Sequence, residues 1–377
     1  MKPPRMIVLS MEGLSTAALG AYGCSWNQTP HLDSLAASGS LFDRCIVPGD
    51  QTADVLCALW QAIPNGMGLQ VISDDLATIQ MAGQCDCAAV RFIDSNAEAF
   101  PAEDVADTIL AQLLAEAAPL VSSKSLPGHA GITWIHSSFL VRAWDAPRSL
   151  LPAESLQDDD LQELADSVDD DLRADSPLRY FDTVQPPRWT CSTADDPDLV
   201  LAWMNTYAAQ VRLLDVMVGI LQELVDGETS RLVILGTSGF ALGESGYIGG
   251  DAGPLTSPRI QVPCLSWGEG IPNVRYIEPC SVITAWQTLV SEQPACHSLL
   301  APEAWAVPIA PEQPPIVTKG RDGTLGITTP TWFYWRHQNQ EQLFVKPDDR
   351  ADTHNVVDRA GEQVLQQFRM GWQSEGT

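Results

Sequence analysis

The first forty residues constrain the fold more than any other part of the chain. Met6-Ile7-Val8-Leu9 is a short, β-branched apolar run that predicts a buried strand, and Glu12 follows where this strand ends. A glycine-containing turn at residues 20–23 leads to Thr29-Pro30, which predicts the start of a helix that ends at Gly39. A strand, a turn and a helix in this order are typical of an α/β sheet. In such sheets, ligands and catalytic groups collect at the carboxyl edge of the strands.

Strand-like and helix-like patterns alternate along most of the remaining chain, as in β-α-β units. Strands are expected at residues 68–73, 88–93, 131–136, 231–235 and 258–265, and helices at 55–60, 76–82, 106–118 and 196–226. Alternating apolar residues towards the C-terminus predict a small antiparallel sheet, followed by a terminal helix near 362–372. We therefore expect an α/β domain over 1–300 and a C-terminal subdomain over 301–377, joined by the proline-rich segment 302–315.

The chain is strongly acidic, since its 48 Asp and Glu residues outnumber its 21 Lys and Arg residues and give a formal net charge of −27. This charge disfavours nucleic acid and anionic membranes as partners, because phosphate binding requires basic side chains that displace counterions. No apolar run is long enough to span a bilayer and no leader-like segment opens the chain, so a cytoplasmic location is expected. The nine scattered cysteines are expected to be mostly buried, reduced thiols. A small molecule or a protein remains as the partner, and the sequence does not choose between them.

Several motifs follow one another along the chain in a characteristic order and spacing. They are Leu19-Gly20-Ala21-Tyr22-Gly23, the run 29–36 with Gly39 and Phe42, Trp144-Asp145-Ala146-Pro147, the helix at 207–221, Gly326–Pro330 with Trp332, and the segment 343–357. Together they resemble the sulfatase family of the alkaline phosphatase superfamily. The resemblance implies a three-layer α/β sandwich, with a mixed, mostly parallel sheet between helices, plus a small C-terminal antiparallel subdomain. It also implies hydrolysis of sulfate esters with the help of a divalent cation.

The residues at the metal-binding positions of this family mostly differ here. The resemblance places the first metal site, an Asp-Asp pair, at Glu12 and Gly13, so that one carboxylate remains. Glu12 is therefore a candidate metal ligand, or alternatively a solvated or N–H-capping carboxylate at a strand end. The second metal site falls at Thr237 and Ser238, whose hydroxyls are poor substitutes for a carboxylate and an imidazole. No cofactor is expected on this basis, with Ca²⁺ or Mg²⁺ as the ion if a metal site survives.

The nucleophile position of the family falls at Thr52, where sulfatases need a Cys or Ser to form formylglycine. Thr52 is a candidate nucleophile of the phosphatase type if a neighbour acidifies it, and its alternative role is a helix N-cap. Asp54 and Leu56 stand where the family has Pro and Arg. The substrate-binding His of the family falls at Val141, which neither binds an anion nor transfers a proton.

Other polar residues are expected near the same edge of the sheet. His136, at the end of the strand 131–136, is a further candidate catalytic group, and Asp54, Glu244 and Ser245 are candidate substrate-binding residues. Two more features have competing interpretations. The acidic run 158–175 is either a calcium-binding loop or a solvated surface, and Cys85-Asp86-Cys87 offers only half of a zinc pattern.

The loss of several ligand positions on a retained scaffold favours one hypothesis: a catalytically inactive relative of the sulfuric ester hydrolases that serves in binding or assembly. The alternative is a working sulfate or phosphate ester hydrolase with a rebuilt site. That alternative uses Thr52 as the nucleophile and requires Glu12, Asp54, His136 and Glu244 to converge at one end of the sheet.

Overall fold

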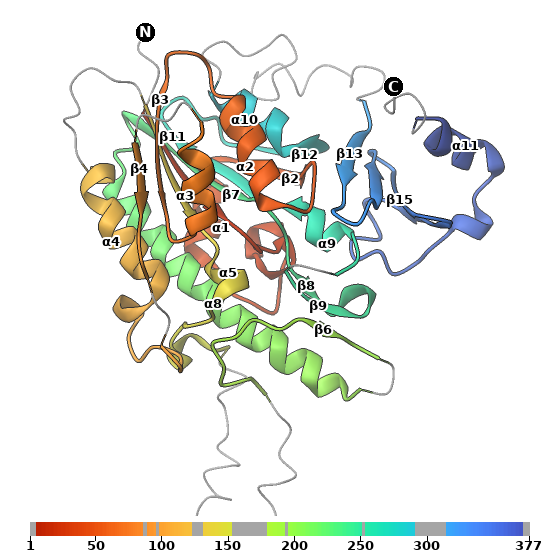
Figure 1. The fold of residues 1–377 in the computed structure, drawn as a ribbon, viewed down its shortest axis with the longest axis horizontal. Helices are drawn as coiled ribbons and strands as arrows, with labels where there is room; N and C mark the ends of the chain where they lie inside the picture. Colours follow the sequence, from red (N-terminus) through yellow and green to blue (C-terminus); the bar gives the residue numbers. More distant parts are fainter. Residues whose placement is uncertain are drawn as a thin grey trace, which may run out of the picture.

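The computed structural model describes residues 5–85, 89–95, 98–122, 131–152, 179–192, 195–250, 253–290 and 314–371. It consists of a large α/β unit and a smaller antiparallel unit at the C-terminus, drawn in blue in Figure 1. The acidic run 158–175, Cys87, most of the proline-rich segment and the expected boundary at 300/301 lie outside the described residues.

Nine strands of the described segments form the main sheet, in the order β10-β2-β11-β7-β1-β5-β3-β4, with β12 also paired to β2. They are β1 (Arg5–Met11), β2 (Ser40–Ile46), β3 (Gly68–Ser73), β4 (Ala89–Phe92), β5 (Gly131–Ser137), β7 (Ser230–Gly236), β10 (Gln261–Val262), β11 (Cys264–Gly268) and β12 (Val274–Ser281). The strands β7, β1, β5, β3 and β4 run parallel, and β12 runs parallel to β2, whereas β10 and β11 are antiparallel to their neighbours. The mixed, mostly parallel sheet predicted from the sequence is confirmed.

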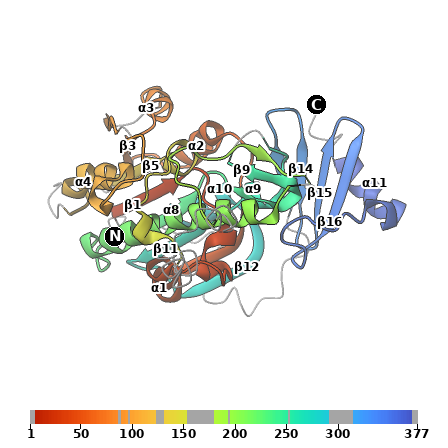
Figure 2. The ribbon, with the colours of Figure 1, turned by 90° about the horizontal axis from the view of Figure 1, so that it is seen from below.

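Helices cover both faces of this sheet (Figure 1). They are α1 (Pro30–Ser38), α2 (Thr52–Gln61), α3 (Leu76–Ala82), α4 (Ile109–Ser122), α8 (Pro197–Leu224) and α10 (Val282–Val290). In β1, Ile7 and Leu9 pack in the core shared with α1, α4 and α8, whereas Met6 and Val8 pack in the core shared with α2 and α10. Figure 2 shows α8 running along the sheet, on the face where it shares a core with α1 and α4. The chain therefore forms the predicted three-layer sandwich.

Two acidic residues of the motifs have structural roles as helix caps. Asp215 in α8 accepts hydrogen bonds from the backbone N–H groups of His31 (3.2 Å) and Leu32 (2.8 Å) in the first turn of α1. Asp145 accepts a hydrogen bond from the N–H of Ile109 (2.7 Å), the first residue of α4. Because the first N–H groups of a helix have no partner within the helix, these carboxylates tie α1 and α4 to distant parts of the chain.

Local structure departs from the sequence prediction in two places. Residues 258–265 do not form one strand, because Ser257–Ile260 forms the short helix α9 before β10 and β11 begin. Gly39 ends α1 as expected, but its φ of −134° is extended rather than left-handed. It has to be glycine for another reason, since an added Cβ would collide with the carbonyl oxygen of Ser266.

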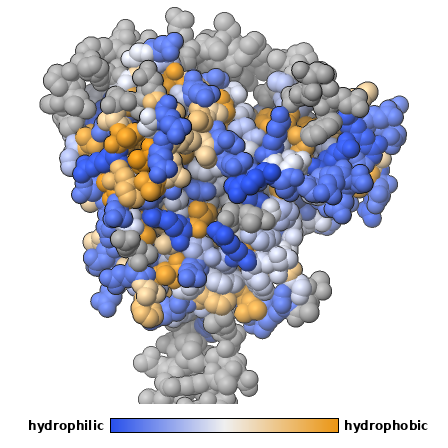
Figure 3. Space-filling view, viewed as in Figure 1, coloured by the Kyte–Doolittle hydropathy of each residue, from blue (hydrophilic) through white to orange (hydrophobic). Residues whose placement is uncertain are grey.

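Short elements complete the large unit. A three-stranded sheet is built from β6 (Trp189–Thr190), β8 (Ala241–Leu242) and β9 (Tyr247–Gly249), and α5 (Phe139–Arg142) follows β5. At the sheet edge, β4 has all four residues exposed, and Figure 3 shows apolar side chains gathered over β4 and α3, where Leu76, Val90 and Phe92 are exposed.

The C-terminal unit is an antiparallel sheet with one helix packed on it, as predicted. Its strands are β13 (Ile316–Lys319), β14 (Leu325–Thr328), β15 (Trp332–His337) and β16 (Gln340–Val345), in sequence order, and the helix is α11 (Glu362–Gly371). Leu365 and Phe368 of α11 are buried against this sheet. None of the helices that the structure describes is both long and apolar enough to cross a membrane.

Candidate active site

Three parallel strands of the main sheet end side by side. In the register of the sheet, Met11 at the end of β1 is paired with Ser137 of β5 and with Gly236 of β7. The residues that follow these ends, Glu12, Ser138 and Thr237, therefore lie at one edge, as expected for parallel strands. The N–H of Glu12 donates to the carbonyl of Ser137 (3.0 Å), and the half-buried side chain of Glu12 belongs to this edge.

Thr52 and Thr237 meet at this edge. The hydroxyl oxygens of Thr52 and Thr237 are 3.4 Å apart, and the Thr237 hydroxyl also donates to the carbonyl of Met11 (3.3 Å). Thr52 is the first residue of α2, and Gln51 is the N-cap, so the alternative role of Thr52 as an N-cap is wrong. Its side chain faces the sheet edge instead. The sequence thus brings the expected nucleophile position and one of the expected metal positions together.

The hydroxyl of Ser238 is occupied by the backbone of the loop after β1. Ser238 Oγ accepts a hydrogen bond from the N–H of Gly13 (2.9 Å), and the carbonyl of Ser238 accepts one from the N–H of Leu14 (3.0 Å). Tyr207 of α8 fastens the same loop, because its hydroxyl donates to the Gly13 carbonyl (2.8 Å) and accepts from the Ser15 N–H (2.9 Å). Ser238 thus acts as a structural clamp in this structure.

Val141 fills the space in front of Gly13. A Cβ atom added to Gly13 would lie 2.5 Å from Val141 Cγ1, and one added to Gly250 would also collide with this methyl group. Phe240 is also close, since its Cδ2 would lie 3.6 Å from a Cβ atom added to Gly13. Gly13 also has a φ of +78°, a conformation that other residues adopt only with strain. The side chain of Val141 therefore occupies the space that a side chain at position 13 or 250 would need.

His136 is fully buried inside the sheet rather than presented at its edge. Its Nδ1 lies 2.9 Å from Ser10 Oγ, which also accepts a hydrogen bond from Trp134 Nε1 (2.7 Å). Among the described residues, His136 Nε2 has no hydrogen-bond partner. Burial lowers the pKa of His136 to about 4, so the imidazole is neutral at neutral pH. A neutral ring without solvent access does not exchange protons with a substrate.

The three expected substrate-binding residues belong to two elements, α2 and the turn between β8 and β9. Asp54 is exposed in the first turn of α2. Glu244 lies in the turn between β8 and β9, where it accepts a hydrogen bond from the N–H of Leu242, and burial raises the pKa of its carboxyl group. Ser245 is exposed, with a φ of 56° in the same turn. Glu244 and Ser245 thus serve the turn of a hairpin.

A buried carboxylate at the same edge was not predicted. Asp74, directly after β3, accepts hydrogen bonds from the Ser137 hydroxyl (2.6 Å) and the Ser138 N–H (3.2 Å). It also forms an ion pair with Arg142 (3.1 Å), and burial raises the pKa of Asp74 against the opposing effect of Arg142. Its position after a predicted strand could have revealed it, as for Glu12. Asp74 holds the ends of β3 and β5 together.

Comparison with known proteins identifies the architecture. No protein-family model and no curated protein sequence matches the chain. Many solved structures match it in fold. The phosphonate monoester hydrolase of Agrobacterium radiobacter is 12% identical, with a TM-score of 0.69 over 99% of this chain and 94% of that chain. This chain has the sulfatase fold. A 2-O GAG sulfatase is 13% identical, with a TM-score of 0.68 over 99% of this chain and 92% of that chain.

A more distant neighbour has the same architecture. A protein of the alkaline phosphatase superfamily from Vibrio parahaemolyticus is 12% identical, with a TM-score of 0.52 over 95% of this chain and 87% of that chain. Identities this low show the fold alone. The sulfatase fold predicted from the motifs is therefore confirmed, and the chemistry has to be judged from the side chains of this chain.

The sulfatase fold implies a divalent metal ion at the edge after β1 and β7, and the residues here do not fit one. Ca²⁺ and Mg²⁺ require several oxygen ligands, chiefly carboxylates. Of the four expected positions, only Glu12 carries a carboxylate, whereas Gly13 has no side chain and the hydroxyls of Thr237 and Ser238 are hydrogen-bonded to the backbone. Within the described ranges, no group of three or more His, Cys, Asp and Glu side chains is placed to hold a metal ion.

Proposed function

We propose that this chain is a catalytically inactive relative of the sulfuric ester hydrolases and that it functions as a binding protein. The observation that carries this proposal is the filled space at the end of β1. Val141 packs so closely against Gly13 and Gly250 that neither glycine could gain a side chain without displacing it. The site thus lacks room for side chains at positions 13 and 250, and it also lacks the ligands for a metal-assisted reaction on an ester.

The state of Thr52 supports the same conclusion. A threonine hydroxyl has to be deprotonated to attack an ester, which requires an adjacent base or a cation. The hydroxyl of Thr52 contacts the hydroxyl of Thr237, which is neither a base nor a cation. His136, a predicted base, is buried within the sheet and hydrogen-bonded to Ser10. The imidazole of His136 is therefore not directed at Thr52.

The partner and the location remain proposals of the same kind. The net charge of −27 supports a small molecule or a protein as the ligand, rather than nucleic acid or an anionic membrane. The described cysteines are all free, which supports a reducing compartment such as the cytoplasm.

Turnover and metal content measured on the same preparation test the proposal. The purified protein is assayed with p-nitrophenyl sulfate and p-nitrophenyl phosphate in the presence of Ca²⁺ or Mg²⁺, and its metal content is measured by mass spectrometry. We expect no turnover and no stoichiometric metal. The matched control is Thr52→Val, which keeps the shape of the side chain and removes the hydroxyl. Turnover that accompanies a stoichiometric metal and is lost in Thr52→Val would overturn the proposal.

The contact between Thr52 and Thr237 also keeps one alternative function in view. A hydrolase that used Thr52 as its nucleophile would need this residue at the carboxyl edge, and its contact with Thr237 supports this. This alternative predicts turnover that Thr52→Val abolishes and that Asp54→Asn or Glu12→Gln reduces. The two functions are therefore distinguished by the same assay.

A further inference from the structure

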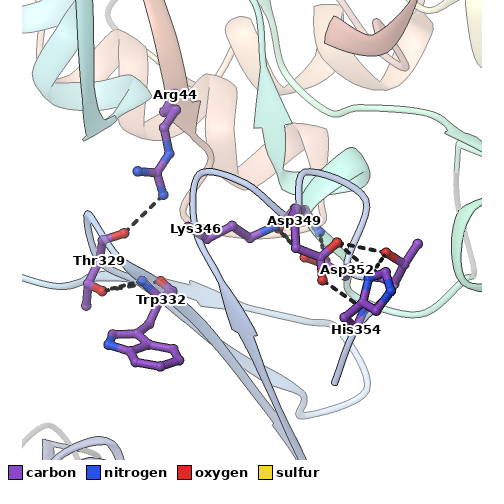
Figure 4. Close-up of polar contacts among 9 residues, drawn as sticks. Arg44, Thr329, Trp332, Lys346, Asp349, Asp352 and His354 are labelled. Atoms are coloured by element: carbon purple, nitrogen blue, oxygen red, sulfur yellow. Dashed lines mark hydrogen bonds and ion pairs between the residues drawn. The ribbon is translucent and has the colours of Figure 1, made fainter. Parts of the chain in front are cut away.

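A cavity of about 290 Å³ lies between the two units of the protein. Its walls come from the loop after β1, from β2, from the segment around α9 and from the segment that follows β16. Figure 4 shows this junction, with Arg44 of β2 directed at the C-terminal unit and Lys346 reaching towards Asp349 and Asp352. Thr52, Thr237 and Ser238 do not line the cavity, so what it binds is independent of the proposed inactivity.

Three basic side chains line this cavity in a chain that has only 21 Lys and Arg residues: Arg44, Lys346 and Arg350. The charge of Lys346 is used within the protein, because its Nζ forms a buried ion pair with Asp352 at 2.6 Å. Asp352 is also held by the N–H and the hydroxyl of Ser257. The basic charges that remain for a ligand are those of Arg44 and Arg350.

The two acidic residues of the lining each have a partner of their own. Asp43 forms a two-point ion pair with Arg275, which joins its carboxylate through both Nε (2.8 Å) and Nη2 (2.6 Å). The Glu244 carboxylate accepts the backbone N–H of Leu242 within its own turn. With three basic and two acidic side chains, the lining has one positive charge in excess within a strongly negative protein. This local positive charge favours an anion in the cavity, whereas the negative charge of the rest of the protein disfavours anions elsewhere on the surface.

Both arginines are fixed by one side and leave donors on the other. Arg44 donates through Nη1 and Nη2 to the carbonyls of Pro330 (2.7 Å) and Thr329 (3.0 Å). Arg350 donates through Nη1 to the carbonyl of Tyr22 (2.9 Å), and no hydrogen bond of its Nε or Nη2 to the described residues is found. A guanidinium held in this way is preorganised, and its remaining N–H groups match the two-point geometry of an oxyanion.

The wall also has an apolar part, beside the polar residues Thr16, Ser257 and Gln261. Ala17, Pro258, Ile277 and Pro347 line the cavity, and the side chain of Ile277 is 66% exposed at a position in the edge strand β12. An inorganic ion alone would leave this apolar wall in water, whereas an organic body would cover it. The cavity volume suits a compact ligand with a single ring rather than a polymer.

We propose that this cavity binds a small organic molecule that carries an oxyanion, such as a carboxylate, a sulfonate or a phosphonate. Arg44 and Arg350 hold the oxyanion, and the apolar wall covers the body of the molecule. Because Arg44 and Arg350 each bridge the large unit and the C-terminal unit, a bound ligand also strengthens the junction between them.

Calorimetric titration at constant ionic strength tests this proposal. The probes are benzoate, benzenesulfonate and phenylphosphonate, with inorganic phosphate as the probe without an organic body. We expect saturable binding of one equivalent of at least one aromatic probe, and affinity lowered about tenfold or more by Arg350→Gln, because a charge-assisted hydrogen bond is lost. Arg44→Gln should weaken binding in the same way, with thermal unfolding used to confirm that the variant is folded.

The matched control is Arg359→Gln, which removes the same charge from an exposed position outside the cavity. This variant should bind the probes as the unaltered protein does. Equal weakening in Arg350→Gln and Arg359→Gln would reduce the effect to net charge and overturn the site. Absence of saturation with all probes at about 10 mM would also overturn it, and equal affinity for inorganic phosphate and phenylphosphonate would overturn an organic ligand.

Discussion

The buried imidazole of His136 should make the stability of the protein fall as the pH falls. In an unfolded chain a histidine has a pKa near 6.5, whereas burial lowers the pKa of His136 to about 4 in the folded protein. Between these values the unfolded state binds the proton more readily, so protonation favours unfolding. The contribution of neutral His136 to stability is therefore complete above pH 6.5 and is lost as the pH falls towards 4.

The magnitude follows from the two pKa values. At about 1.4 kcal/mol for each pH unit, the full span corresponds to about 3 kcal/mol, and the part lost between pH 8 and pH 5 is about 2 kcal/mol. Other groups act in the opposite direction. Burial raises the pKa of Asp145 to about 6 and also raises the pKa values of Asp74 and Asp215, so their protonation stabilises the folded state. A pH profile of the unaltered protein alone would therefore mix both effects.

The variant His136→Asn isolates the effect of the imidazole. Asparagine keeps a polar atom near the position of Nδ1, which lies 2.9 Å from Ser10 Oγ, but it does not titrate. Reversible urea unfolding of both proteins is measured from pH 5 to pH 8. The unaltered protein should lose about 2 kcal/mol more than His136→Asn over this interval, whatever the offset at pH 8. Parallel profiles would refute the reasoning, because they would mean that His136 is hydrated or paired in the folded state.

Three further predictions concern contacts that hold the fold together, each measured by chemical denaturation. Gly13→Ala should lower the free energy of unfolding by about 2–4 kcal/mol, through the collision with Val141 and the positive φ, and adding Val141→Ala should recover part of this loss. Asp352→Ala should cost about 3–5 kcal/mol, because it leaves Lys346 buried without its partner, and Lys346→Met combined with Asp352→Leu should cost less than this single change. Asp215→Ala should cost about 1–2 kcal/mol through loss of the α1 cap, whereas Asp215→Asn should cost less; equal losses for the two would show that the carbonyl oxygen is not the capping acceptor.

Most of the fold was predictable because its determinants are local. Buried parallel strands appear as short apolar runs, and the helices show apolar residues at helical spacing, so β1, β3, β5, β7, α4 and α8 were found with small errors at their ends. The expected strand at 258–265 failed for a tertiary reason. The N–H and hydroxyl of Ser257 are held by Asp352, 95 residues away, and this contact accompanies a helical turn at α9.

The site was predictable only in part. The position of a residue after a strand indicates which edge it occupies. This rule predicted the edge position of Glu12, whereas Thr237 was assigned through the family resemblance, and both follow strands that end at this edge. The rule does not indicate in which direction a side chain points at the end of the strand. His136 therefore turned out to be inside the sheet, and Glu244 was committed to the turn of its own hairpin. The cavity was beyond sequence reasoning, because its lining joins Arg44 and Arg350, which are far apart in the chain.

The close packing of Val141 against Gly13 and Gly250 couples substitutions at these three positions to one another. A carboxylate side chain introduced at position 13 would collide with the Val141 methyl group, and a side chain introduced at position 250 would meet the same group. A single substitution at position 13 or 250 is thus penalised by the collision with Val141. Building a metal site at this edge would therefore require coordinated substitutions at several positions rather than a single exchange.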